Sequence, residues 1–166
     1  RIALADFYKV PPENIMVGNG SDEILSFAFM AFCDKNTGVS YPDISYGFYP
    51  VFADLYGISK NELPLRGDFT ICVSDYFNID NTIVIANPNA PTGISLSHEN
   101  IENIVKSNPN NVVVVDEAYI DFGGDSCIPL TAKYDNLLVV QTYSRSRSIA
   151  GARLGYAVGN KELIAD

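Results

Sequence analysis

Apolar runs rich in β-branched residues alternate along the chain with stretches of helical periodicity. The runs are three to five residues long and most are bounded by Gly, Pro, Asn or Asp, which is typical of short strands. The predicted strands are residues 14–17, 39–41, 82–86, 112–115, 137–140 and 154–158. Helices are predicted from residue 21, over 46–56, from 97 to about 107, and over 161–166.

The run of four valines at residues 112–115 does not alternate apolar with polar side chains. A strand of this kind is covered on both faces, as in a parallel sheet flanked by helices. We therefore expect an α/β fold with three α/β/α layers and a mostly parallel central sheet.

Two of the predicted helices carry start signals. Ser21 follows a glycine turn and precedes Asp22 and Glu23, which suits an N-cap and an acidic first turn. Ser97 is predicted to cap the helix that ends before Pro109. In the helix over 46–56, the side chains expected to share one face are Tyr46, Tyr49, Val51, Phe52 and Leu55.

Polar motifs follow the predicted strands at the points where the strands end. They occupy residues 18–23, 87–93, 116–119 and 142–148. In open α/β sheets, ligands bind at the carboxyl ends of the strands. The sequence therefore predicts one site that is assembled from four loops.

Composition narrows the possible functions. The chain has 166 residues with 11 Lys and Arg against 20 Asp and Glu, a net charge of -9, and lacks the basic cluster that nucleic-acid binding needs. Its 47% apolar content excludes disorder, and its apolar runs are far shorter than the roughly 20 residues that span a bilayer.

Charged residues make up only 19%, which indicates that missing chain or a partner subunit covers some of the surface. Three widely spaced cysteines without a CxxC pattern predict a reduced, cytoplasmic chain with no metal site.

Two motifs suggest chemistry on their own. Residues 18–23 form a glycine turn before a helix, which suits either a phosphate site or a plain tight turn. A dinucleotide-binding site is disfavoured because its fingerprint needs a third glycine, which is absent here.

Asp116 follows the four valines at the end of the predicted strand. A buried carboxylate is costly without a partner, so a role in a site is favoured over a structural role. Residues 112–117 also resemble the strand that holds magnesium in nucleotide hydrolases, but those enzymes need a GxxxxGK[ST] motif, which this chain lacks. An aspartate fixed against a protonated heterocyclic nitrogen is what pyridoxal chemistry requires.

Taken together, the motifs resemble those of fold-type I pyridoxal-phosphate aminotransferases, and the branch they resemble most is histidinol-phosphate aminotransferase. The resemblance rests on residues 18–25, 46–49, 87–93, 116–119 and 142–155, in the family's order and spacing. It implies the large-domain fold of that family. It also implies that residues 1–166 are the cofactor-binding large domain, incomplete at both ends relative to the family.

The resemblance implies two groups of contacts to pyridoxal 5'-phosphate. The first group would hold the phosphate through the start of a helix, a hydroxyl and a guanidinium: Gly20, Ser21, Asp22, Ser144 and Arg153.

The second group would hold the pyridine ring. Tyr46 would stack on it, Asp116 would pair with its nitrogen, and Tyr119 would donate a hydrogen bond to its phenolic oxygen. The family usually has Asn directly before Pro-Thr-Gly for that same oxygen, but this chain has Ala90, and Asn89 is the substitute to consider.

A second departure concerns the catalytic residues, which the resemblance places at residue 145, Asp116 and Tyr119. The family has a lysine that carries the cofactor where this chain has Arg145. A guanidinium stays protonated at any ordinary pH, so it cannot bond covalently to the cofactor or shuttle a proton. The substitution is natural, engineered or an error, and the sequence leaves these alternatives open.

The function implied is transamination between histidinol phosphate and 2-oxoglutarate in histidine biosynthesis (EC 2.6.1.9). The alternatives are a threonine-phosphate decarboxylase, another fold-type I aminotransferase, or a non-catalytic fragment that binds cofactor or a partner. The expected partners are small-molecule substrates and, in the full-length form, a second copy in a homodimer, with no nucleic acid and no membrane.

Overall fold

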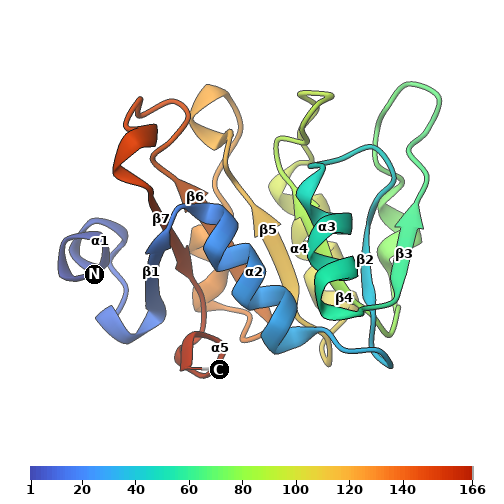
Figure 1. The fold of residues 1–166 in the computed structure, drawn as a ribbon, viewed down its shortest axis with the longest axis horizontal. Coiled ribbons are helices and arrows are strands. Elements are labelled where there is room, and N and C mark those ends of the chain that lie inside the picture. The colour runs from blue at the N-terminus through green and yellow to red at the C-terminus, as the bar shows by residue number, and fades with distance from the viewer. Residues whose placement is uncertain (166) are drawn as a thin grey trace.

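The centre of the fold is a seven-stranded sheet, seen in Figure 1 in the computed structural model, which describes residues 1–165. Its strand order is β1-β7-β6-β5-β4-β2-β3, and among these strands only β7 runs antiparallel to its neighbours on both sides. The mostly parallel sheet is thus confirmed. The strands are β1 (Ile15–Asn19), β2 (Val39–Pro42), β3 (Lys60–Leu63), β4 (Thr82–Ala86), β5 (Val113–Asp116), β6 (Leu137–Thr142) and β7 (Leu154–Val158).

Helices cover both faces of the sheet and make the three layers. α2 (Ser21–Phe32) and α3 (Phe48–Tyr56) lie on the face toward the viewer in Figure 1, and α4 (His98–Ser107) packs on the other. α1 (Ile2–Tyr8) lies beside the β1 edge, and α5 (Lys161–Ala165) follows β7. Short 3₁₀ turns at 12–14, 73–76, 120–122, 128–132 and 150–152 complete the connections.

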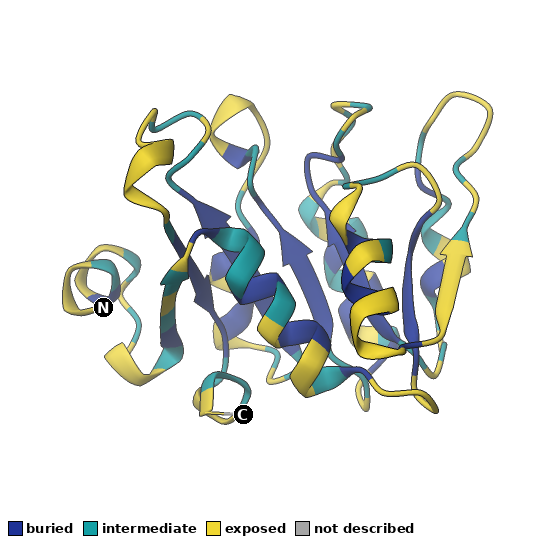
Figure 2. Ribbon diagram, viewed as in Figure 1, coloured by how far each residue is buried: buried dark blue, intermediate teal, exposed yellow. Residues whose placement is uncertain are grey.

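The sheet separates two apolar cores because alternate residues of each strand point to opposite faces. Val113 and Val115 pack in the core that contains α4, whereas Val114 packs in the core that contains α2 and α3. The central strands are therefore buried on both sides, as their unbroken apolar runs predicted (Figure 2).

The structure corrects several expectations. Ser21 is the first residue of α2 and not its cap, because Gly20 occupies the cap position and no side chain caps the helix. Val51 and Leu55 are exposed on α3, whose buried residues are Tyr49, Phe52 and Ala53. The helix predicted over 161–166 is confirmed to residue 165, and residue 166 lies outside the described part.

Two elements have no counterpart in the prediction, α1 and the edge strand β3. The part of the chain that the structure describes contains no helix with the length and apolar character needed to cross a membrane. The three cysteines are free thiols in this part of the chain, and two of them are buried.

Candidate active site

The carboxyl edge of the sheet lies along the upper side of Figure 1, and a small cleft is located at this edge. It is formed by the start of α2, the loop before α3, the ends of β4 and β5, and the loops at 87–93 and 143–149. This is where ligands bind in open α/β sheets. Five of the predicted site residues line it. The lining residues are Ser21, Tyr46, Ala86, Ala90, Asp116, Ala118, Tyr119 and Arg145.

Asp116 is the last residue of β5 and lies at the floor of the cleft, only 4% exposed. Its Oδ2 accepts a hydrogen bond from the Tyr49 hydroxyl at 2.9 Å, and its Oδ1 accepts one from the Ala118 N–H at 3.1 Å. No ion pair joins it to any cation of the described residues. Burial raises the pKa of Asp116 to about 6, which these two hydrogen bonds partly oppose. A cationic group in the cleft would stabilise the charged carboxylate.

Two tyrosines form aromatic walls of the cleft. The Tyr46 hydroxyl donates to Asp22 Oδ1 at 2.8 Å, and its ring lies edge-on to Tyr49 with the centroids 5.6 Å apart. Burial and the Asp22 carboxylate raise the pKa of Tyr46, which keeps its hydroxyl protonated. Tyr46 lies just before α3 and not within it, since the helix begins at Phe48. Tyr119 is half-buried on the segment that follows β5.

The other end of the site is the start of α2. The first N–H groups of a helix have no partner within the helix, and no side chain caps them here. Arg153 lies beside them, with its Nη2 3.8 Å from Asp22 Oδ2 and 3.4 Å from the Asn19 carbonyl oxygen. Helix N–H groups next to a guanidinium fit a phosphate.

Two glycines allow this close arrangement. Gly20 has a φ of +83°, and a Cβ there would lie 2.6 Å from Arg153 Nη2. A Cβ on Gly155 would lie 2.3 Å from the Gly20 carbonyl carbon and 2.4 Å from Ser21 N. The start of β7 is therefore pressed against the start of α2, which explains why both positions lack a side chain.

Residue 145 extends into the cleft from the loop after β6. Arg145 Nε donates to the Tyr119 hydroxyl at 3.0 Å, and its guanidinium carbon lies 5.4 Å from the Tyr119 ring centroid. Ser144 lies next to it, with its Oγ 2.9 Å from Thr142 Oγ1 and 3.4 Å from Arg145 Nη1. Ser144 thus adjoins the cleft without lining it.

Asn89 does not line this cleft, although it shares a neighbouring pocket with Tyr119. Its Nδ2 donates to the Ile44 carbonyl at 3.0 Å and to Thr92 Oγ1 at 3.1 Å, and its Oδ1 accepts from Ser45 Oγ at 2.8 Å. The amide is used to fix the loop at 87–93, and Ala90 is the residue that lines the cleft. The structure therefore gives Asn89 no free donor toward a ligand.

One residue of the site was missed from the sequence. Tyr49 was assigned to the apolar face of a helix, but its hydroxyl is the hydrogen-bond donor to Asp116 in the core. The available signal was chemical, since a buried tyrosine hydroxyl needs a partner and Asp116 was already expected to be buried.

The arrangement separates two kinds of contact across one cleft. An unpaired carboxylate and aromatic walls at one end suit a flat, positively charged heteroaromatic ring, and the α2 start with Arg153 suits an anionic group. Among residues 1–165, no group of three or more His, Cys, Asp or Glu side chains is placed to share a metal ion.

Comparison with known proteins adds independent findings. The family model described as aminotransferase class I and II matches residues 1–166. Histidinol-phosphate aminotransferase of Lactococcus lactis subsp. cremoris is 51% identical over 165 residues, which are 99% of this chain and 46% of that protein. The enzyme of that name from Brachyspira hyodysenteriae is 52% identical over 97% of this chain and 46% of its own length. The chain therefore spans about half the length of these relatives.

Solved structures show the same fold. The histidinol-phosphate aminotransferase of Clostridium acetobutylicum matches 99% of this chain and 50% of its own with a TM-score of 0.90 and 26% identity. L-threonine-O-3-phosphate decarboxylase of Porphyromonas gingivalis matches 98% of this chain and 51% of its own with a TM-score of 0.86, also at 26% identity.

Proposed function

The chain belongs to the class I and II aminotransferase family, and from this premise we propose that it is the pyridoxal-phosphate-binding part of a histidinol-phosphate aminotransferase. The observation that carries the proposal is the buried, unpaired Asp116 at one end of a cleft whose other end is the start of α2 beside Arg153. The names of the relatives at about 50% identity support histidinol phosphate and 2-oxoglutarate as the substrates.

The phosphate of the cofactor would bind at the start of α2. The N–H groups of Ser21 and Asp22, the Ser144 hydroxyl and the Arg153 guanidinium are the proposed donors. Gly20 leaves room for Arg153 to approach.

The ring would bind against Tyr46, with Asp116 at its nitrogen and Tyr119 at its phenolic oxygen. Pyridoxal phosphate supplies an electron-withdrawing ring that stabilises negative charge on the substrate carbon bonded to the amino group. The task of Asp116 is to hold a proton on the ring nitrogen, and its hydrogen bond from Tyr49 keeps the carboxylate in place. Tyr46 covers one side of the site and excludes water from it.

Arg145 decides how the cofactor would be held. Its guanidinium remains protonated, so it cannot replace the lysine that carries the cofactor in this family, and binding to this chain would be non-covalent. Arg145 instead donates to Tyr119, and its positive charge favours the ionised form of Asp116. Because the proton carrier of transamination is absent, we propose that the chain as written binds the cofactor without turnover.

The presence of Arg145 in place of a lysine also favours a second candidate function, in which the protein binds pyridoxal phosphate or a partner without catalysing a reaction. A threonine-phosphate decarboxylase is a further alternative, supported by the structural match to the Porphyromonas gingivalis enzyme.

A homodimer is part of the proposal. Three large apolar side chains lie exposed on the outer face of α3, Phe48 at 47%, Val51 at 50% and Leu55 at 69%. Apolar side chains gathered on one exposed helix face support a protein interface, and we assign this face to a second copy of the chain. We place the protein in the cytoplasm, where three free cysteines would stay reduced.

Titration of the whole encoded protein with pyridoxal phosphate tests the proposal. Arg153→Met should weaken binding about tenfold or more, because it removes a charge-assisted contact to phosphate. Arg66→Met removes an exposed arginine outside the cleft and should leave the affinity unchanged. A folded parent that does not bind, or equal effects of both variants, would contradict the proposal.

The substrate is tested in the Arg145→Lys protein. We expect transfer of the amino group from histidinol phosphate to 2-oxoglutarate. Release of carbon dioxide from threonine phosphate, without transamination, would instead establish the decarboxylase alternative.

A further inference from the structure

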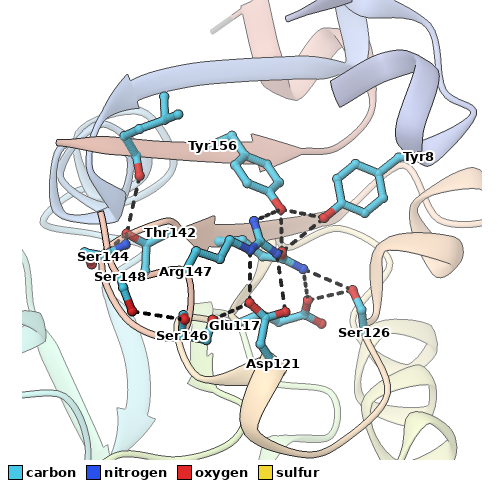
Figure 3. A network of polar contacts seen from close by, with 12 residues as sticks. Tyr8, Glu117, Asp121, Ser126, Thr142, Ser144, Ser146, Arg147, Ser148 and Tyr156 are labelled. Atoms are coloured by element: carbon cyan, nitrogen blue, oxygen red, sulfur yellow. Dashed lines mark hydrogen bonds and ion pairs between the residues drawn. The ribbon is translucent and has the colours of Figure 1, made fainter. Parts of the chain in front are cut away.

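A network of polar side chains lies beside the cleft and connects segments that are distant in sequence (Figure 3). Its centre is Arg147, two residues after Arg145. Arg147 Nε lies 3.0 Å from Asp121 Oδ2, and its Nη2 lies 3.4 Å from Asp121 Oδ1. Ser146 Oγ also donates to Asp121. One carboxylate thus receives hydrogen bonds from two neighbouring residues of the loop that carries Arg145.

Arg147 is held on its other sides as well. Its Nη2 donates to Gln141 Oε1 and its Nη1 to the Tyr156 hydroxyl, both at 3.0 Å. The guanidinium carbon lies 4.6 Å from the ring centroid of Tyr143. A planar guanidinium makes these contacts together, and a lysine ammonium would make only some of them.

Gln141 extends the network toward the floor of the cleft. Its Oε1 accepts from Arg147, so its Nε2 is turned to Glu117, where it donates to Oε2 at 2.7 Å. Glu117 is buried directly after Asp116 and also accepts from the Ser126 hydroxyl at 2.6 Å and the Cys127 N–H at 2.5 Å. The network therefore joins the loop after β6 to the residue next to the candidate ring contact.

The loop at 144–148 lies at the protein surface, and one of its backbone hydrogen bonds is internal, from the Ser148 N–H to the Arg145 carbonyl at 3.0 Å. None of its five residues is buried, and Ser148 adopts a positive φ of 56°. Its partner segment carries Tyr119 and Asp121, which stand two residues apart, just as Arg145 and Arg147 do. Each member of one pair contacts a member of the other, Arg145 with Tyr119 and Arg147 with Asp121.

We infer that Arg147 and Asp121 form a clasp that fixes the loop carrying Ser144 and Arg145 against the segment carrying Asp116 and Tyr119, and that both are positioning residues for the ligand. The inference rests on the proposed function in taking the ligand to be pyridoxal phosphate. The clasp is partly shielded from water, with the two side chains 26% and 35% exposed, so it is screened less than a surface ion pair. The pKa of Asp121 is lowered by the Ser146 hydroxyl and by Arg147, so the clasp stays ionised at neutral pH.

Asp121→Asn in the whole encoded protein tests the clasp with two readouts. The dissociation constant for pyridoxal phosphate, measured well below the melting temperature, should rise at least fivefold. The rate of tryptic cleavage after Arg145, measured without ligand, should also rise at least fivefold because the loop is released. The matched control is Asp54→Asn, which breaks the 2.7 Å ion pair between Asp54 of α3 and Lys60 of the edge strand β3 and should change neither readout.

Arg147 variants separate positioning from a general loss of stability. Arg147→Met should weaken binding as Asp121→Asn does, and the double variant should be no weaker than either single one, because both remove the same clasp. Arg147→Lys keeps a charge facing Asp121 and should recover part of the affinity.

Unchanged affinity and unchanged cleavage in Asp121→Asn would overturn the inference. A lower melting temperature with an unaltered dissociation constant would also overturn it, since it would make the clasp merely structural. A parent that fails to bind pyridoxal phosphate would contradict the proposed function, and the cleavage rates would still decide whether the clasp fixes the loop.

Discussion

Asp116 shows how burial gives one side chain its chemistry. The carboxylate lies where β4 and β5 end and receives two hydrogen bonds, but no ion pair joins it to a cation among the described residues. Its pKa of about 6 lies above the usual value near 4 for an unfolded chain. The ionised carboxylate therefore lowers the stability of the folded protein at neutral pH, and a protonated ring nitrogen beside it would offset this loss.

Asp116→Asn should consequently stabilise the ligand-free protein more at pH 7.5 than at pH 4.5. Between the unfolded and folded pKa values the folded state binds more protons, so the stability of the parent falls as the pH rises toward 6. The stability of the asparagine variant does not fall in this way. Its free energy of unfolding relative to the parent should therefore increase by about 2 kcal/mol between pH 4.5 and pH 7.5. Urea unfolding of both proteins at the two pH values measures the difference.

The same substitution should have the opposite effect when pyridoxal phosphate is bound, because a neutral asparagine side chain at this position cannot pair with a charged ring nitrogen. A variant advantage that is independent of pH would show that Asp116 is not the group that titrates near 6.

The surroundings of a single residue could be predicted from the sequence where one strong physical constraint determines them. Asp116 follows a run of four valines, so its burial at the end of a strand could be foreseen. Asn89 differs because its amide is engaged by Ile44, Ser45 and Thr92, and contacts within a loop leave no periodic signal. The partner of Arg147 was equally hidden, since Asp121 lies 26 residues away in the chain.

At the scale of elements, the junction between β7 and α2 shapes the anion-binding end of the site. Gly155 pairs with Gly18 across the β1–β7 ladder and touches the backbone at Gly20 and Ser21. The neighbouring atoms are main-chain atoms, so they cannot move aside as the end of a flexible side chain does.

Gly155→Ala should therefore destabilise the protein by about 1–3 kcal/mol, the usual cost of overpacking, and should also weaken pyridoxal phosphate binding. Gly67→Ala is the control, because nothing lies within 4 Å of a Cβ there. Thermal unfolding and ligand titration of both variants provide the comparison. Equal stability of the two would mean that β7 and α2 are not in close contact.

The elements that the sequence predicted well are those with a buried, continuous pattern. The predicted bounds of β4 and β7 match those observed, and Ser97 caps α4 by accepting from the Asn100 N–H at 3.2 Å. β3 was missed because it is an edge strand of mostly exposed residues, which leaves no apolar run to detect.

In the whole molecule, α3 presents an apolar face that the rest of the described chain does not cover. Val51 and Leu55 were expected to share a helix face with Tyr49 and Phe52, but they are exposed, as is Phe48, whereas Tyr49 and Phe52 are buried. Periodicity marks apolar positions and does not say which partner covers them, a second layer of the same chain or another subunit. The low charged fraction of 19% already indicated a covered surface, which the sequence could not locate.

Val51→Asp should weaken self-association of the whole encoded protein by at least tenfold, because it places a charge within the proposed apolar contact. Phe69→Asp alters an exposed aromatic residue on a loop outside α3 and serves as the control. Sedimentation equilibrium over a range of concentrations measures both. A parent that is monomeric throughout, or two variants that dissociate alike, would refute the assignment of this face.

We propose that the cleft binds pyridoxal phosphate and that Arg145 alone prevents a covalent link. Borohydride reduction of the parent and of Arg145→Lys with pyridoxal phosphate present, followed by intact mass and peptide mapping, tests both statements. We expect no pyridoxyl adduct at residue 145 in the parent and one adduct at residue 145 in the variant. A folded variant that remains unlabelled at residue 145, or a parent that is labelled there, would contradict the account.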